Sequence, residues 1–333
     1  MYNAEEYLDE CIRSLLNQSL RDCEFIFVND GSIDKSRIII EGYQEKDKRI
    51  KLVNQSNQGV SAARNAALKI LTGEYVGFVD ADDFIEKEMY QTLYTAASHK
   101  NCDAVISNFE SELEGNKLLT KYPFQSDIQL NRSFIMDVIM PYFLKHDNLN
   151  TVVSKIYRSD LLIKCQINFP EKIALGEDGM FNILFFSHAL TMMYVDYTGY
   201  HYREVLGSAT RNIGEKDYFN QALEVYLAAT PDIYKEIMSV KDVNRLKSIR
   251  LINSVISYIY IYFKPNKEMS LKNRYHYVNR MITNKYVRAA IPDYRKEMSG
   301  SIGRYESYIV SMVKSRFTFG LLLAVTYSRL RNS

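Results

Sequence analysis

The fold of this chain is constrained most by an alternation of helical and strand-like patterns. Apolar residues recur with helical spacing at 4–19, 31–47, 60–73 and 178–187. Short apolar runs of β type lie between them at 24–30, 50–55, 74–80, 103–109 and 190–196. Strands that alternate with helices indicate an α/β fold, which we expect to be a mixed, largely parallel sheet flanked by helices on both faces.

A second region is indicated by the change of pattern near residue 215, after which long helical segments replace the strand-like runs. With 333 residues, of which 47% are apolar, the chain is long enough for two cores. We predict an α/β domain at 1–212 and a mostly helical region at 213–333. Because an open α/β domain usually begins with a buried strand and this chain enters a helix almost at once, we expect its first β-strand to be missing.

The charge distribution bears on the class of partner. Acidic residues outnumber basic ones in 1–198, and basic residues outnumber acidic ones in 199–333. The acidic segment 1–198 argues against a nucleic-acid groove, so we expect no nucleic-acid partner. The basic segment 199–333 suits an anionic membrane surface or an anionic partner. The cysteines are widely spaced, no stretch is long enough to span a bilayer, and no signal peptide is visible, so we expect a cytoplasmic protein.

The stretch "GFVDADDF" at 77–84 places Asp80, Asp82 and Asp83 directly behind an apolar run. One interpretation is a solvated turn whose carboxylates cap the next helix. The other is a divalent cation site, because oxygen ligands hold a hard metal that also binds a substrate diphosphate. A bound cation would relieve the repulsion between the carboxylates.

Three further residues are candidates for a site at the strand ends. Asp30 ends the run 24–30, where it either forms a helix-capping turn or accepts from a nucleobase or ribose. Arg64 lies among alanines on a helix after a glycine, as a surface residue or as a ligand contact, and the segment matches neither the Rossmann nor the P-loop pattern. Asp178 stands beside Glu177 at a helix start, where the two acids either complement the helix dipole or one of them acts as a general base.

His201, in "YHYREVLGSATR", is either a ligand or a packing residue between tyrosines. Taken in order, the segments of residues 2–210 resemble family 2 glycosyltransferases of the GT-A fold, especially bacterial enzymes that build capsular polysaccharide, exopolysaccharide or lipopolysaccharide. The resemblance lies in "YNAEEYLDECIRSLLNQS", "FVNDGSIDKS", "NQGVSAARNAAL", "GEYVGFVDADDF", "SKIYRSDLL", "FPE" and "GED".

The resemblance assigns roles to the candidate residues. It implies that Asp30 contacts the base of a UDP-sugar and that Arg64 lies by the nucleotide. It implies that Asp80 lies near the ribose, that Asp82 binds Mg²⁺ or Mn²⁺, and that Asp178 is the catalytic base. The implied reaction is inverting, metal-dependent transfer of a hexose or N-acetylhexosamine from the UDP-sugar donor to a hydroxyl of a growing, lipid-linked surface glycan.

Two departures from the family pattern and two alternative functions remain open at this point. The usual opening strand is absent, and Val152 and Val153 stand where relatives often have a tryptophan. A sugar nucleotidyltransferase would also use an α/β sheet and a metal, but it would show a glycine-rich loop with a basic residue. A non-catalytic nucleotide-sugar-binding scaffold is the other alternative, against which Asp82 and Asp178 argue.

The last segment, 315–333, carries an apolar stretch from Phe317 to Val325. Lys314 and Arg316 flank it on one side, and Arg329 and Arg331 on the other. This layout suits either a helix docked on the protein's own core or a peripheral contact with the inner face of the cell membrane.

Overall fold

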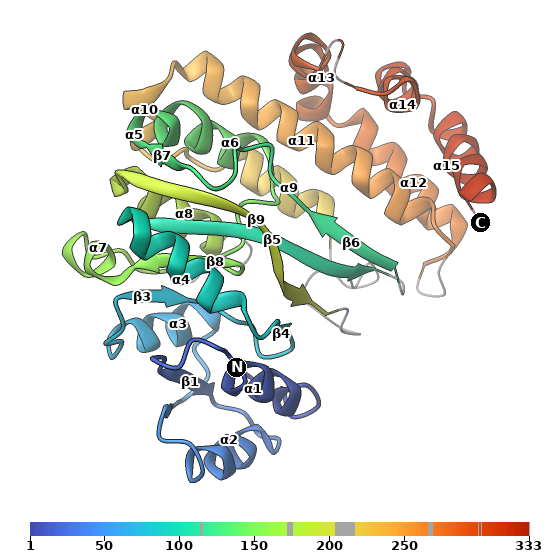
Figure 1. The fold of residues 1–333 in the computed structure, drawn as a ribbon. Helices are drawn as coiled ribbons and strands as arrows, with labels where there is room; N and C mark the ends of the chain where they lie inside the picture. Colours follow the sequence, from blue (N-terminus) through green and yellow to red (C-terminus); the bar gives the residue numbers. More distant parts are fainter. Residues whose placement is uncertain are drawn as a thin grey trace. The chain divides into compact units, whose positions relative to one another are not determined.

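The computed structural model describes residues 1–113, 116–171, 176–203, 217–265, 269–298, 300 and 302–332 (Figure 1). The chain divides into two compact units, one comprising Met1–Phe143 with Asn148–Leu206 and the other Leu144–Asp147 with Gly207–Ser333. The predicted domain boundary between 212 and 213 lies outside the described residues, so the domain assignment stays a prediction.

The first unit begins with an α/β segment of parallel strands. Its elements are α1 (Leu8–Leu16), β1 (Phe25–Asp30), α2 (Ser36–Gln44), β2 (Ile50–Gln55) and α3 (Val60–Leu68). β1 and β2 pair in parallel from Phe25 opposite Ile50 to Asp30 opposite Gln55. Met1 lies beside β1, since its amino group donates to the Val28 carbonyl at 2.9 Å. Its carbonyl accepts from the Asp30 N–H at 2.9 Å. The expectation that a first β-strand is missing stays a prediction.

The main sheet of this unit has the strand order β3-β8-β5-β9-β4, with β6 beside β5 and β7 beside β9 (Figure 1). The strands are β3 (Tyr75–Gly77), β4 (Phe84–Ile85), β5 (Ala104–Leu113), β6 (Asn116–Thr120), β7 (Gln129–Asn131), β8 (Lys155–Arg158) and β9 (Thr191–Tyr202). The predicted mixed sheet flanked by helices is confirmed.

The expectation that the sheet is largely parallel is wrong. Among the described strands of the main sheet, only β5 and β9 pair in parallel. β8 pairs antiparallel with both β3 and β5, and β4 pairs antiparallel with β9. A short apolar run looks the same in either direction, because its side-chain pattern records burial and not the direction of its neighbour.

Helices and aromatic side chains fill the core around this sheet. The helices are α4 (Met89–Lys100), α5 (Arg132–Phe134), the π-helical turn η1 (Ile135–Ile139), α6 (Met140–Lys145), α7 (Ser159–Lys164) and α8 (Glu177–His188). On α8, Phe181 and Phe185 pack against Tyr157 of β8 with ring centroids 5.3 and 5.0 Å apart. Phe169 stacks on Phe181 at 4.2 Å, so the start of α8 is anchored by a rigid aromatic cluster.

The second unit is helical, as predicted. Its helices are α9 (Tyr218–Leu227), α10 (Ile233–Ile237), α11 (Val240–Phe263), α12 (Leu271–Thr283), α13 (Lys285–Glu297), α14 (Arg304–Ser315) and α15 (Thr318–Asn332). α11 is the central helix and packs against α9, α12, α13 and α15. Within the described parts of the chain, no helix combines the length and apolar character needed to cross a membrane.

Candidate active site

The turn after β3 carries the three predicted carboxylates, and Asp83 is its anchor. Asp83 is 1% exposed, accepts from the Tyr200 hydroxyl at 2.5 Å and accepts from the Arg203 N–H at 2.9 Å. The Asp83 N–H donates to the Asp80 carbonyl at 3.1 Å, which closes the turn. The Tyr200 hydroxyl also accepts from the Asp80 N–H at 3.2 Å. One carboxylate therefore fixes the backbone that presents the other two.

The electrostatics of the turn differ from residue to residue. Burial, and then the charge of Asp80, raise the pKa of Asp83 to about 8. The same two causes, in the same order, raise the pKa of Asp82, while the positive charge of Arg203 lowers it. The Arg203 guanidinium donates to the Asp82 carbonyl at 3.0 Å and forms an ion pair with Glu10 at 2.6 Å. Burial and a neighbouring negative charge thus both disfavour the ionised form of Asp82.

Arg64 joins two of the predicted acids. Its guanidinium forms an ion pair with Asp80 at 2.9 Å and a second ion pair with Asp178. Only 13% of the Arg64 side chain is exposed, and it lies over the Phe169 ring at 5.2 Å. Burial lowers the pKa of Arg64, but the charges of Asp80 and Asp178 outweigh this effect and raise it. Arg64 therefore stays charged between two carboxylates from distant segments.

Asp178 lies in the first turn of α8, after Gly176, whose φ of 140° is one that side chains rarely adopt. Besides pairing with Arg64, its carboxylate accepts from the Val152 N–H at 3.2 Å. Burial raises the pKa of Asp178 to about 6, while the charge of Arg64 acts in the opposite direction. A carboxylate with this pKa is mostly ionised at neutral pH and still basic enough to accept a proton.

The start of α3 is fixed by Asp30, which is 4% exposed. One carboxylate oxygen accepts from the Gln55 side chain at 2.7 Å and from the Gln58 N–H at 2.9 Å. The other oxygen accepts from the N–H of Gly59 at 2.8 Å, directly before α3. Asp30 therefore holds the loop that leads into the helix carrying Arg64.

The predicted site residues come together to different degrees. Arg64, Asp80 and Asp178 are joined directly, and Asp82 follows in the same turn as Asp80. Asp30 is connected to these residues through the loop before α3. Burial lowers the pKa of the Met1 amino group, while the charges of Asp30 and Asp80 act to raise it. The structure brings these residues together, and their assignment as a functional site and their individual roles stay predictions.

His201 has a different environment. Its ring stacks on Phe84 with centroids 4.7 Å apart, and its nitrogens pair with Glu110 at 3.1 Å and Glu86 at 2.9 Å. These contacts favour the packing interpretation. Tyr200 and Arg203, which hold the acidic turn, were not identified from the sequence. Their position beside His201 in "YHYR" is the signal that could have identified them.

The acidic turn suits a divalent cation that protein and substrate bind together, and not a cation enclosed by protein ligands alone. Within the described residues, no group of three or more His, Cys, Asp or Glu side chains could hold a metal ion. Mg²⁺ usually takes one or two carboxylates and completes its shell with substrate phosphates and water, so a full protein cage is not required. Burial, and then the charge of Asp80, raise the pKa of Asp82, and this favours a cation here because a positive charge would offset the repulsion between the two carboxylates.

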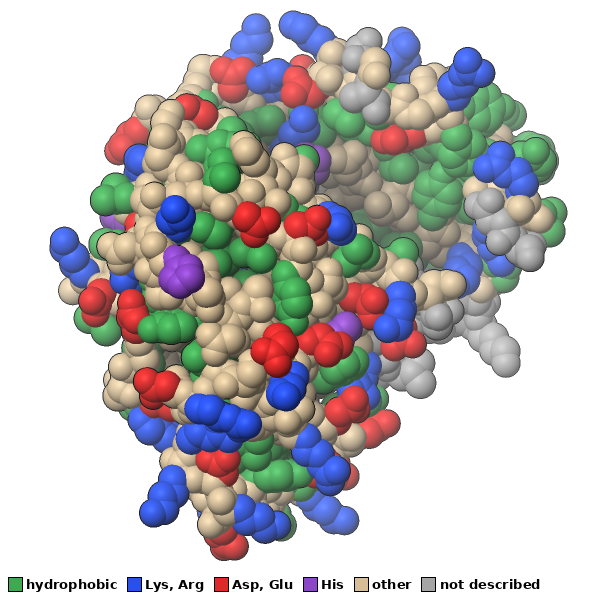
Figure 2. Space-filling view, viewed as in Figure 1, with side chains coloured by type: hydrophobic (Ala, Val, Ile, Leu, Met, Phe, Trp, Pro, Cys, Tyr) green, Lys and Arg blue, Asp and Glu red, His purple; other side chains and the backbone are tan. Residues whose placement is uncertain are grey.

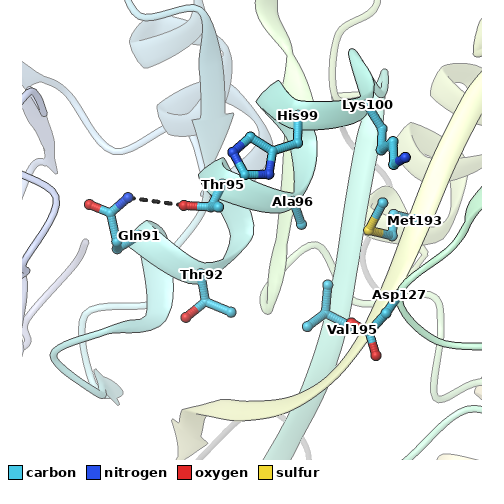
Figure 3. Close-up of a pocket in the computed structure, with 9 residues that line it drawn as sticks. All are labelled: Gln91, Thr92, Thr95, Ala96, His99, Lys100, Asp127, Met193 and Val195. Carbon is cyan, nitrogen blue, oxygen red and sulfur yellow. Dashed lines mark hydrogen bonds between the residues drawn. The ribbon is translucent and has the colours of Figure 1, made fainter.

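An open pocket of about 470 Å³ lies elsewhere in the first unit. Figure 3 shows its residues on α4 and β9, together with Asp127 from the segment before β7, and Gln91 donates to Thr95 along α4 at 3.0 Å. It is lined by Gln91, Thr92, Thr95, Ala96, His99, Lys100, Asp127, Met193 and Val195. None of the predicted site residues lines it, so the candidate active site is defined by the Arg64 ion pairs and the acidic turn.

Comparisons with known proteins identify the class. The family model described as glycosyl transferase family 2 matches residues 1–160. The uncharacterized glycosyltransferase EpsJ of Bacillus subtilis is 30% identical over 96% of this chain and 92% of its own. A poly(ribitol-phosphate) beta-glucosyltransferase of Bacillus spizizenii is 30% identical over 55% of this chain and 28% of its own. S. aureus TarS 1-349, solved with UDP-GlcNAc, aligns with a TM-score of 0.62 and 19% identity over 99% of this chain and 90% of that one.

The fold is therefore of the GT-A type, and the class of protein is a glycosyltransferase. The chain belongs to glycosyltransferase family 2, since EpsJ matches nearly its whole length. The predicted family and enzyme class are confirmed, and they favour sugar transfer over the sugar nucleotidyltransferase alternative.

Proposed function

We propose that this protein is an inverting, metal-dependent glycosyltransferase that moves a hexose or N-acetylhexosamine from a UDP-sugar to a hydroxyl of a growing surface polysaccharide. The observation that carries the proposal is the pair of bonds from Arg64 to Asp80 and Asp178. These bonds join the acidic turn to a carboxylate whose pKa of about 6 suits a general base. The UDP-GlcNAc complex of TarS supports the donor class, and the named substrate of the Bacillus spizizenii relative supports a polymeric acceptor.

Asp178 is the proposed base. As the acceptor oxygen attacks the anomeric carbon, the bond from that carbon to UDP breaks and the acceptor proton moves to a carboxylate oxygen of Asp178. Arg64 and the Val152 N–H orient this carboxylate, and the charge of Arg64 keeps it ionised at neutral pH. A direct displacement of this kind inverts the anomeric configuration, since the acceptor arrives opposite the leaving group.

The acidic turn is the proposed donor site. Asp82 would hold Mg²⁺ or Mn²⁺, which when bound neutralises the diphosphate and stabilises the departing UDP. Asp80, oriented by Arg64, is proposed to lie near the ribose, and Arg64 itself beside the nucleotide. Asp30 is proposed to contact the base, although both of its oxygens already hold the loop before α3. In this proposal the loop before α3 would form one wall of the base site.

The acceptor is proposed to be lipid-linked and the reaction cytoplasmic. Cys11, Cys23, Cys102 and Cys165 are all free, which fits a reducing compartment. A lipid-linked glycan would bring the enzyme to the inner face of the membrane.

The full chain incubated with a panel of UDP-sugars, Mn²⁺ and a candidate acceptor, with UDP release as the readout, tests the proposal. We expect one donor to be turned over, with the Asp178→Asn variant slowed by about 10²–10⁴-fold, the range for loss of a general base. Asp160→Asn is the matched control, because Asp160 is an exposed acid in the first turn of α7. Binding of UDP with no turnover of any donor, by a chain whose folding is verified, would instead favour the non-catalytic scaffold.

A further inference from the structure

Helix α15 carries apolar side chains on two opposite sides. One side is buried in the helical unit: Leu321 and Val325 are 0% exposed, and the helix packs against α11, α12 and α14. On the other side, Phe319 is 53% exposed, Leu323 54% and Tyr327 65%. A helix that only docked on its own core would carry polar residues on the outer side. The docked-helix interpretation of this segment therefore accounts for one face of α15 and leaves the other face unexplained.

The exposed apolar residues form one continuous strip. At about 100° per residue, Phe319, Leu323, Tyr327 and Leu330 fall within about 80° of the helix circumference. Leu330 is 74% exposed, and Phe317, directly before the helix, is 52% exposed. Hydrophobic side chains are visible at the surface in Figure 2 where Figure 1 places α14 and α15, with Lys and Arg side chains among them.

Basic residues border this strip. On the same helical projection, Arg329 lies on one side of the strip and Arg331 on the other, and both are exposed. Lys314 and Arg316 are exposed just before the helix. No acidic residue follows Glu306 in the sequence, so no carboxylate within this segment neutralises the four cations.

We propose that the exposed face of α15 binds the surface of an anionic lipid bilayer, with its apolar strip in the interface and its arginines at the lipid phosphates. An apolar strip between cations matches a surface with anionic headgroups over an apolar interior. A second copy of the chain fits less well, because a twofold contact through this face would bring like charges together. The inference goes beyond the proposed sugar transfer, and neither the donor nor Asp178 enters it.

Flotation of the full chain with lipid vesicles is the test. The parent should float with vesicles of phosphatidylcholine mixed with phosphatidylglycerol and float weakly with phosphatidylcholine alone. Binding should weaken as ionic strength rises from about 0.1 M to about 1 M, because the screening length shortens from about 10 to about 3 Å. Equal binding to both vesicle types, or the same binding at both salt concentrations, would overturn the electrostatic part of the proposal.

Variants separate the apolar and the charged contributions. The double variant Phe319→Ser with Leu323→Ser should bind about tenfold more weakly or worse. Its matched control is Leu227→Ser with Leu271→Ser, since these leucines are 53% and 50% exposed on other helices of the same unit.

The charge variant is Arg329→Gln with Arg331→Gln, and about a tenfold loss of binding is expected. Its control is Lys48→Gln with Lys69→Gln, which removes two exposed cations from the first unit and should leave binding unchanged. Thermal unfolding of each variant shows whether it folds. Unchanged flotation of both α15 variants would overturn the proposal. If the parent is a dimer, the apolar variant is a monomer and neither protein binds vesicles, the face would be assigned to self-association instead.

Discussion

Replacing Arg64 with methionine should shift the pH dependence of sugar transfer. Arg64 pairs with Asp178 and Asp80, and its charge opposes the effect of burial on the pKa of Asp178. Without the guanidinium, burial and the charge of Asp80 both act to raise that pKa further above about 6. The ionised fraction of the proposed base then falls at neutral pH, so the acid limb of the rate profile should move to higher pH.

The size of the shift follows from the geometry. Two unit charges about 4 Å apart interact by about 4 kcal/mol at an effective dielectric constant of about 20, which corresponds to about three pKa units. Since 13% of the Arg64 side chain and 24% of the Asp178 side chain are exposed, solvent screens part of this interaction. We therefore expect the midpoint of the acid limb to rise by about one to two units in the Arg64→Met variant.

The assay is kcat/KM for UDP release between about pH 5 and pH 9, with saturating Mn²⁺, because kcat/KM reports the free enzyme's essential base. Arg49→Met is the control, since Arg49 is a partly buried arginine that pairs with Asp47 at 2.8 Å. A midpoint that stays within about 0.3 units of the parent would refute the electrostatic role of Arg64, whatever happens to the plateau rate.

The same variant has a stability signature of known sign. A carboxyl group whose folded pKa is raised destabilises the fold as pH rises from its unfolded pKa, near 3.8, through its folded pKa, about 6. Removing Arg64 extends this pH range upward, because Asp178 then ionises at a higher pH and without a partner cation. The loss in unfolding free energy should be about 2 kcal/mol at pH 8, and it should shrink toward pH 5 as the carboxyl groups take up protons.

Three further substitutions test the acidic turn and the base. Asp82→Asn should lower Mn²⁺-dependent turnover by about 10²-fold or more, because an amide is a poorer ligand for a hard cation. Asp22→Asn, in an exposed turn, is the control. A loss of only a few-fold in Asp82→Asn would contradict the metal assignment. Asp178→Asn should bind UDP almost normally in calorimetry while transfer slows, and a matching collapse of UDP affinity would make it a structural acid. Tyr200→Phe should lower the free energy of unfolding in urea by about 1–3 kcal/mol, because the buried Asp83 loses its hydroxyl donor. An unchanged midpoint of the urea transition would show that the turn is held without this hydroxyl.

The elements that could be predicted from the sequence are those whose pattern is local. The run 50–55 coincides with β2, and 24–30 differs from β1 by one residue at its start. The helix expected at 60–73 ends at Leu68, five residues earlier. The helix expected within 31–47 begins at Ser36, and Ser32 accepts from the Asn3 N–H at 3.1 Å. These ends depend on contacts with distant residues, which periodicity does not record.

The site could be predicted only where its residue types are distinctive by themselves. A cluster of aspartates at a strand end is conspicuous in the sequence, and so is an acid at a helix start. Their partners are not conspicuous, because Tyr200 lies 117 positions from Asp83 and Arg64 lies 114 positions from Asp178. A tyrosine or arginine becomes part of the site only when the fold brings residues of β9, α3 and α8 together.

The crowding of three carboxylates in "DADD" now has a physical account, because the three do not share one environment. Asp83 is buried and held by Tyr200, and its pKa of about 8 keeps it mostly protonated at neutral pH, while Asp80 is paired with Arg64. Asp82 is left with a raised pKa and the weaker opposing charge of Arg203. One of these acids is therefore protonated and one is paired within the protein, whereas the third is the proposed ligand for a cation. Because that cation competes with a proton for Asp82, binding of Mn²⁺ should weaken as pH falls, independently of the titration of Asp178.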